Sequence, residues 1–250
     1  PGLLYLSRTN NSYQGGTHIG AGTLRIAGDG SLGAVPASPT TNITFDDGTL
    51  QLDGNITLNT NRTLQLNPGT TGTIDTQTYN GTVAGAITGG GGFGKSGSGM
   101  LTLSSANTYT GSTTVNNGHL RIGHAFAMTG GGALHVASTG ILSLNNYDAS
   151  VGGLTGPAGA VIRNNGTSAV ATLTLNVAGG VHTYSGAIAD GSTQPVALVK
   201  DGAGTQVLNG TLTHTGGTTV NGGMLRVDSA LGGNVTINAG GTVGGTGTIA

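Results

Sequence analysis

GKSGSGMLTLSSANTYTGSTTVNNGHLRI (94–122) and VKDGAGTQVLNGTLTHTGGTTVNGGMLRV (199–227) are two copies of one stretch of sequence, set 105 residues apart. A looser third copy occupies residues 1–26. The anchor pairs that share the 105-residue offset are Tyr79 with Tyr184, Lys95 with Lys200, Tyr109 with His214, and Arg121 with Arg226. Such repetition is typical of proteins that stack one structural unit on the next, because a single unit cannot bury its apolar side alone.

The offset divides the chain into pieces of one repeat array. Residues 1–26 are the end of one repeat unit, 27–121 a second unit, 122–226 a third unit, and 227–250 the start of a further coil. We therefore expect a single β-helix segment over residues 1–250, with no separate globular domain.

A shorter repeat inside these units pairs two alternating apolar strands across a turn. Val115, for example, is followed five residues later by Leu120 and then by Ile122. Alternation of this kind points one residue in two toward a core. Two positions before the second strand's first apolar residue stands a glycine, or in one copy Arg62: the glycines are Gly22, Gly48, Gly118, Gly140, Gly223 and Gly241. Glycine at this place predicts a positive φ or a corner with no room for a side chain.

The composition also favours strands and turns. Glycine fills 51 positions, charged residues make up 7% of the chain, and every acidic residue is an aspartate. Strong helix formers such as Glu and Lys are nearly missing, whereas Thr, Val, Asn and Gly favour strands and turns. With such short strands and small corners, the sequence predicts an all-β fold, a right-handed parallel β-helix (β-solenoid) of about a dozen coils, instead of a sandwich or propeller.

Charge and cysteine content exclude several classes of function. The net charge is −1 and no basic cluster is present, which argues against nucleic-acid binding. The chain has no cysteine, so it has no disulfide and no thiolate metal site. The N-terminal PGLLYLSRTN lacks the layout of a signal peptide. If the protein is exported, we expect this chain to be a processed or excised piece.

Three stretches carry a resemblance to a known family: GAGTLRI (20–26), the copy at 94–122, and GGNVTINAGGTVGGTGTIA (232–250). They resemble the passenger-associated repeats of bacterial autotransporters, the type V secretion proteins. The resemblance implies a secreted passenger folded as a β-helix and carried to the cell surface by a C-terminal outer-membrane β-barrel of the same polypeptide. It also implies that the repeats aid folding during secretion. This chain shows no barrel sequence.

The leading functional hypothesis is a non-catalytic stalk segment that presents an adhesive or effector tip of a virulence-type surface protein. Two alternatives stay open. The solenoid could itself be an adhesin, or associate with copies of itself into filaments. It could also belong to a passenger whose protease, esterase or carbohydrate-active domain lies outside this chain.

GGGGFGKS (89–96) matches the phosphate-loop pattern G-x-x-x-x-G-K-[ST]. A phosphate loop needs a helix after it, since the helix N-terminus supplies amide donors to the anion. Downstream lies a β pattern instead, and in the second copy Gly94 and Ser96 become Val199 and Asp201. We therefore expect no nucleotide and no cofactor, and interpret Lys95 as an outward, solvated side chain on a corner.

Other candidate side chains have plainer interpretations. The histidines, which show no metal-ligand spacing, are His18, His119, His124, His135, His182 and His214. His214 replaces Tyr109 and is expected to act as a stacking side chain. Asp46 and Asp47, the one adjacent carboxylate pair, precede Gly48 and fit a turn. Asparagines in Asn-x-Thr/Ser patterns, interpreted as corner amides, are Asn55, Asn61 and Asn80. The sequence thus predicts no catalytic, cofactor-binding or metal-binding residue.

Overall fold

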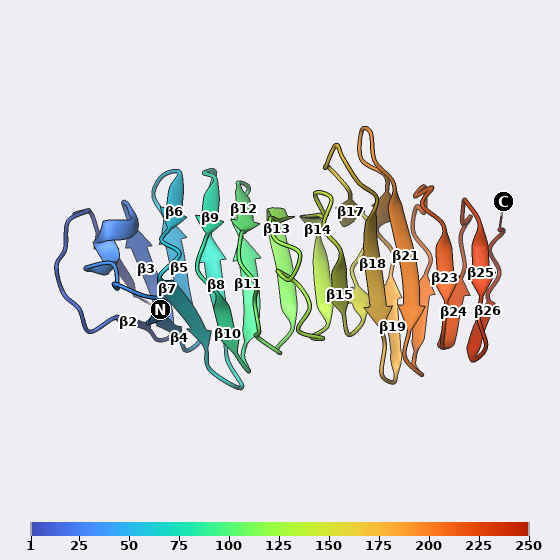
Figure 1. Cartoon of the computed structure of the whole chain (residues 1–250), viewed down its shortest axis with the longest axis horizontal. Coiled ribbons are helices and arrows are strands. Elements are labelled where there is room, and N and C mark those ends of the chain that lie inside the picture. Colours follow the sequence, from blue (N-terminus) through green and yellow to red (C-terminus); the bar gives the residue numbers. More distant parts are fainter. Residues whose placement is uncertain (1, 250) are drawn as a thin grey trace. The chain divides into compact units, whose positions relative to one another are not determined.

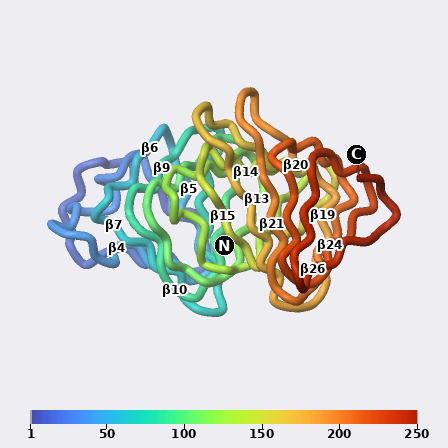
Figure 2. Tube along the Cα trace, turned by 45° about the vertical axis from the view of Figure 1, so that its right-hand side comes forward, coloured from blue at the N-terminus to red at the C-terminus, as the bar shows by residue number. Residues whose placement is uncertain are grey.

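The computed structural model describes residues 2–249, and in that range β-strands are interrupted by a single short 3₁₀ helix, η1 (Asp29–Leu32). The chain divides after Gly130 into two compact units, called unit 1 and unit 2 below. Each unit is a stack of parallel strands (Figures 1 and 2). The predicted parallel β-solenoid of about a dozen coils is therefore confirmed.

Unit 1 has three faces, each a ladder of parallel strands from successive coils. The first ladder contains β1 (Leu3–Leu6), β3 (Gly22–Ile26), β5 (Gly48–Leu52), β8 (Thr71–Asp75), β11 (Gly92–Ser96) and the start of β13 (Thr113–Ile122). The second contains β6 (Ile56–Leu58), β9 (Gly81–Val83), β12 (Met100–Leu103) and the end of β13. The third contains β2 (Thr17–Ile19), β4 (Thr40–Phe45), β7 (Arg62–Leu66) and β10 (Ile87–Gly89).

Unit 2 repeats this plan. One ladder contains β15 (Ala149–Val151), β18 (Ala171–Asn176), β21 (Val196–Asp201), β23 (Thr218–Val220) and β25 (Val235–Ile237). A second contains β19 (Val181–Tyr184), β22 (Thr205–Leu208), β24 (Gly223–Val227) and β26 (Gly241–Gly244). The remaining strands are β14 (Leu134–Ser143), β16 (Leu154–Thr155), β17 (Val161–Arg163) and β20 (Ala187–Ala189). Single bridges at Leu212, Leu231 and Ile249 continue the line of β20.

The core of each unit is a set of columns in which the same strand position of successive coils stacks. In unit 1, Leu24, Leu50 and Ile74 stand in one column, and all three are buried. Burial of one such side chain stabilises the fold by roughly 1.5–3 kcal/mol, and it does so only when neighbouring coils cover it. The predicted inward alternation is thus confirmed in the core, although Ile237 in β25 is 53% exposed.

The predicted corner glycines behave as expected at the positions that matter most. Gly118 and Gly223 have φ of 67° and 61°, in the left-handed region. Gly48 has an ordinary φ, but a Cβ there would collide with Ile19. β13 is longer than the predicted short strands, because its backbone continues through the corner at Gly118 and pairs with β11 before it and β12 after it.

Two corners of unit 2 are longer than their counterparts in unit 1. Residues 164–170 join β17 to β18, and residues 190–195 join β20 to β21. They lie side by side, since Thr193 Oγ1 donates to the Gly166 carbonyl oxygen at 3.2 Å. Both project beyond the strand ladders in Figure 1.

The predicted boundaries of the repeat units, at residues 26, 121 and 226, stay a prediction. They are defined by sequence identity between copies, whereas the two compact units are defined by packing. Pro1 and Ala250, the outermost residues of the predicted end pieces, lie outside the described residues.

Candidate functional site: the lysine corners of the long repeat

Lys95 and Lys200 point into the solenoid, which corrects the interpretation of Lys95 as an outward, solvated side chain. Both residues are 0% exposed. Lys95 in β11 aligns with Ile74 on one side and Val115 on the other, and so takes a core position that other coils fill with an aliphatic residue. Lys200 in β21 stands in the same way between Leu175 and Val220.

Each buried ammonium group is held by three backbone carbonyl oxygens. Lys95 Nζ donates to the carbonyl oxygens of Ser96 and Gly97, both at 2.8 Å, and of Asn117 at 3.1 Å. Ser96 ends β11 and Gly97 begins the corner that follows, whereas Asn117 belongs to the corner of the next coil. One side chain therefore joins two successive coils.

The site at Lys200 repeats this geometry. Lys200 Nζ donates to the carbonyl oxygens of Asp201 at 2.8 Å, Gly202 at 2.9 Å and Gly222 at 3.0 Å. The long repeat in the sequence is therefore also a repeat of a buried polar site.

Burial lowers the pKa of the Lys95 amine to about 8, against the opposing attraction of Asp75. Burial likewise lowers the pKa of Lys200, opposed by Asp201. A pKa of about 8 still leaves most of Lys95 protonated at neutral pH. The side chain then offers three N–H donors, which equals the number of carbonyl acceptors around it.

The corner that the two units share requires glycine as well as lysine. A Cβ on Gly118 would lie 2.5 Å from the Gly97 carbonyl oxygen, which is one of the acceptors of Lys95. A Cβ on Gly223 would lie 2.5 Å from the Gly202 carbonyl oxygen, an acceptor of Lys200. The glycine lets the next coil approach closely enough for the lysine to reach it.

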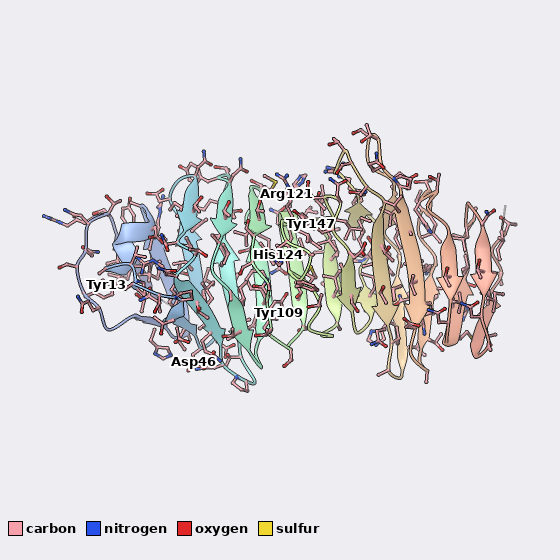
Figure 3. The ribbon with its side chains drawn as sticks, in the orientation of Figure 1. Tyr13, Asp46, Tyr109, Arg121, His124 and Tyr147 are labelled. Atoms are coloured by element: carbon pink, nitrogen blue, oxygen red, sulfur yellow. The ribbon has the colours of Figure 1, made fainter. Side chains whose placement is uncertain are left out.

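A second shared feature lies one corner further along the chain. Tyr109 Oη and Thr113 Oγ1 are hydrogen-bonded at 2.7 Å, and both residues are buried in unit 1 (Tyr109 is marked in Figure 3). In unit 2, His214 Nε2 and Thr218 Oγ1 are 3.0 Å apart at the matching positions. The expectation that His214 substitutes for Tyr109 agrees with this geometry. The side chain makes a specific hydrogen bond in addition to packing.

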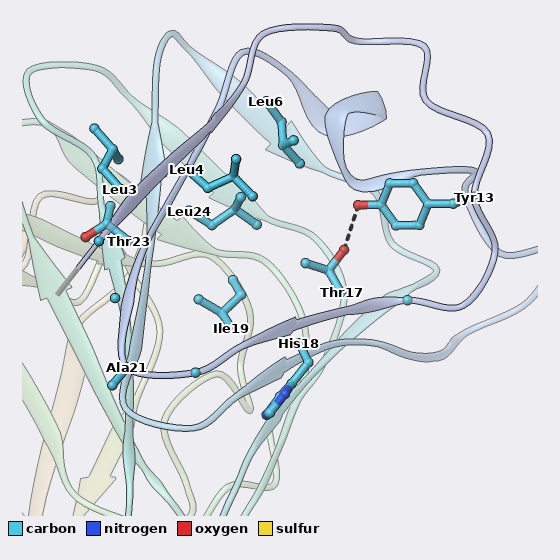
Figure 4. A pocket seen from close by; sticks show the side chains of 14 residues that line it. Leu3, Leu4, Leu6, Tyr13, Thr17, His18, Ile19, Ala21, Thr23 and Leu24 are labelled. Atoms are coloured by element: carbon cyan, nitrogen blue, oxygen red, sulfur yellow. Dashed lines mark hydrogen bonds between the residues drawn. The ribbon is translucent and has the colours of Figure 1, made fainter.

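The looser first copy has the same pair in a more open setting. Tyr13 Oη and Thr17 Oγ1 are 2.8 Å apart, but Tyr13 is 39% exposed. Both residues line a hollow of about 630 Å³ whose apolar wall includes Leu4 and Ile19 (Figure 4). The hollow borders β1, which pairs with β3 along one edge.

His214 has an unusual electrostatic setting for a histidine. Burial lowers its pKa, while the carboxylate of Asp190 acts in the opposite direction. Asp190 itself accepts hydrogen bonds from the amides of Val196 at 2.8 Å and Thr215 at 3.0 Å. His214 is therefore neutral in the fold under conditions in which an exposed histidine becomes protonated.

The phosphate-loop match at residues 89–96 spans the end of β10 and all of β11. The next element is β12, another strand, so the helix that a phosphate loop requires is replaced by β structure. The lysine of the match, Lys95, donates its hydrogen bonds to three backbone carbonyl oxygens.

The aspartates and asparagines singled out in the sequence link successive coils. Asp47, with φ of 62°, accepts a hydrogen bond from the Thr71 amide at 2.8 Å. Asn55 Oδ1 accepts one from the Asn80 amide at 2.8 Å, and Asn80 Oδ1 accepts one from Met100 at 3.1 Å. Asn61 donates to the Pro36 carbonyl oxygen at 2.9 Å. The interpretation as turn and corner groups agrees with these contacts.

Asp46 and the remaining histidines are dispersed. Asp46 lies 3.9 Å from His18, and both side chains are largely exposed. His135 contacts Thr155 at 3.0 Å, and His124 Nδ1 accepts from the Phe126 amide at 3.1 Å. Among residues 2–249, no group of three or more His, Cys, Asp or Glu side chains is arranged to hold a metal ion.

Arg62 is an important side chain that the sequence patterns did not single out as a site. It is 0% exposed, and it binds the Asp29 carboxylate through Nε at 2.8 Å, the Leu32 carbonyl oxygen at 3.0 Å and Asn42 Oδ1. It also donates to the Gly33 carbonyl oxygen at 2.8 Å. The available signal was its replacement of glycine in an otherwise regular pattern.

Within the described range, the structure contains no helix with the length and apolar character needed to cross a membrane.

Comparisons with known proteins identify the lysine corners with a named repeat. The family model described as passenger-associated-transport-repeat matches residues 1–26, 93–122 and 198–227. The second and third matches contain Lys95 and Lys200 together with the Tyr109 and His214 pairs. The chain is also similar to the adhesin BmaC autotransporter of Brucella suis biovar 1 (strain 1330), with 36% identity over 213 residues. That alignment covers 82% of this chain and 6% of the relative. No solved structure matches the chain.

Proposed function

Since the chain belongs to the autotransporter passengers that carry passenger-associated transport repeats, we propose that it is a non-catalytic stalk segment. As part of such a passenger it is secreted and displayed at the bacterial cell surface. The stalk holds an adhesive or effector region of the same polypeptide away from the membrane. It is joined, in the whole protein, to a C-terminal outer-membrane β-barrel.

The observation that carries this proposal is the use of polar side chains between coils. Asp47 and Asn55 each bond the backbone of the following coil, and Lys95 bonds the corners of two coils. Groups that could bind or transform a substrate are thereby used to hold the stack together. Coils that stabilise one another in sequence also support folding that proceeds outward coil by coil during secretion.

The test removes one repeat from the full-length autotransporter without disturbing the coil register. Deletion of residues 122–226 joins Arg121 to Val227, which matches Ile122 in the repeat. A stalk predicts that surface display and tip activity persist while an epitope at the tip moves closer to the membrane. Loss of tip activity with normal surface display would contradict the proposal.

Adhesion by the solenoid itself is the second candidate, because the relative's name describes an adhesin. We measure binding of the purified 250-residue chain to host cells and matrix proteins, with the carboxyl-terminal passenger region of the same autotransporter as a control. The stalk proposal expects no saturable binding by this chain. Saturable binding would favour the adhesin, and an enzymatic domain elsewhere in the passenger is compatible with either result.

A further inference from the structure

The corner around each repeat lysine has the chemistry of a cation-binding site. Three carbonyl oxygens converge within 2.8–3.1 Å of Lys95 Nζ, and three within 2.8–3.0 Å of Lys200 Nζ. Carbonyl oxygens only accept hydrogen bonds, so a group of them that converges on one point can be satisfied by hydrogen-bond donors or by a positive ion at that point. In this chain the ammonium group of a lysine supplies both the charge and the donors.

We propose that each corner is a binding site for an alkylammonium-type cation, which the chain fills with its own lysine and which clamps two successive coils. The acceptors come from both coils: Ser96 is the last residue of β11 and Gly97 follows it, whereas Asn117 lies 22 residues beyond Lys95. The site at Lys200 also reaches 22 residues ahead, to Gly222.

The neighbouring coils show that the column does not need a lysine for packing. Ile74 and Val115 occupy the same column as Lys95 and are fully buried. An aliphatic side chain is thus the default, and replacing it by lysine brings a charge into the core, which costs free energy unless the charge is well bonded. The lysine recurs at the matching position of each unit, with the same three-carbonyl arrangement.

The clamp does not depend on the stalk assignment, because it is a property of the purified chain. We first compare Lys95→Met with wild type by urea unfolding and by hydrogen exchange of the amides around residues 97–99 and 116–119. Ile74→Met is the matched control in the same column. The Ser96 carbonyl oxygen keeps its hydrogen bonds from the Thr76 amide at 3.0 Å and Thr76 Oγ1 at 3.1 Å, whereas the Gly97 and Asn117 carbonyl oxygens lose the donor they share in wild type. Exchange around these corners is therefore expected to accelerate about tenfold or more in Lys95→Met. The corner at Lys200 in the same molecule should keep its protection.

The result that would overturn the proposal concerns the same two measurements. A Lys95→Met variant that is as stable as wild type, with unchanged exchange at these corners, would show that the ammonium is only tolerated. That result would overturn the proposal.

Chemical rescue tests the site itself and applies even if Lys95→Met folds poorly. Lys95→Ala lacks the three terminal carbons and the ammonium group, which n-propylammonium restores. We expect n-propylammonium to raise the urea midpoint of Lys95→Ala with saturation, because a ligand that binds only the folded state stabilises it. Tetramethylammonium, which has no N–H donor, and 1-propanol, which has no charge, are the ligand controls, and Ile74→Ala is the protein control. An equal response of Lys95→Ala and Ile74→Ala, or no response, would refute the cation site.

Discussion

Residues 93–122 of unit 1 and 198–227 of unit 2 form the same local structure from sequences that differ at many positions. The lysine, the corner glycine and the threonine are shared, and the three-carbonyl arrangement is reproduced to within a few tenths of an ångström. The ring that bonds the threonine differs, since it is Tyr109 in one unit and His214 in the other. The repeat therefore specifies a hydrogen-bonding ring at this place, while the titration behaviour of that ring is free to vary.

The largest expected difference between the units comes from Arg62, which belongs to unit 1. The residue 105 positions further on is Thr167, an exposed residue in the long corner 164–170, so the 105-residue offset brings no second arginine to such a site in unit 2. Arg62→Ala removes the positive charge that pairs with the Asp29 carboxylate and the donor to several carbonyl oxygens, although the Asn59 amide still bonds Asp29, and should destabilise the fold by about 3–5 kcal/mol. Hydrogen exchange would locate the loss in unit 1, with unit 2 largely protected. An equal loss of protection in both units would contradict the expectation that the stabilising effect of Arg62 is confined to unit 1.

The next difference is acid sensitivity at His214. Burial lowers the pKa of His214 in the fold, so the unfolded chain takes up the proton first as the pH falls below about 6.5. The stability contributed by the neutral ring is therefore complete above that pH and is lost below it, with a slope of at most about 1.4 kcal/mol per pH unit. Urea unfolding between pH 7.5 and 5 should show this loss in wild type. His214→Tyr should flatten the profile, and an unchanged profile would assign the acid sensitivity to other groups.

The reciprocal substitution sharpens the comparison. Tyr109 does not ionise in this range, because a phenol has an ordinary pKa of about 10 and burial raises the pKa of this hydroxyl further, to about 12. Tyr109→His in a His214→Tyr background should move the acid-sensitive site from unit 2 to unit 1. Hydrogen exchange measured at pH 5 near Thr113 and Thr218 reports which unit loses protection. Loss of protection that stays near Thr218 would contradict the expectation that the histidine determines the acid-sensitive site.

The smallest expected effects concern the aspartates that link coils in each unit. Asp47 accepts from Thr71 at 2.8 Å in unit 1, and Asp148 accepts from Thr172 at 2.7 Å in unit 2. Either change to alanine removes one such bond, at about 0.5–1.5 kcal/mol. Asp47→Ala should be the more costly of the two by about 1 kcal/mol, because Asp47 has a positive φ that alanine tolerates poorly. Equal unfolding midpoints for the two variants would show that the backbone conformation contributes little.

Much of the fold could be predicted from the sequence because its physical signals are local. Alternation in stretches such as Leu120, Arg121 and Ile122 fixes which residues face inward, and Gly118 marks the corner. After the phosphate-loop match the sequence predicts a strand instead of a helix, and β12 stands at that place. Alternation also contained a missed signal: Phe93 and Lys95 have the same parity, as do Leu198 and Lys200. The charge of lysine predicts the opposite orientation, because lysine is almost never fully buried unless its ammonium group is paired.

By itself, the sequence determined the repeat, the strand periodicity and the family, because these depend on residue types at fixed spacings along one chain. Only the tertiary structure decided where Lys95 and Lys200 lie. An ammonium group is stable in the core only if acceptors surround it, and here those acceptors are backbone carbonyl oxygens, one of which lies a full coil away. Carbonyl groups are present at every residue, so no sequence pattern marks the ones that stacking brings together.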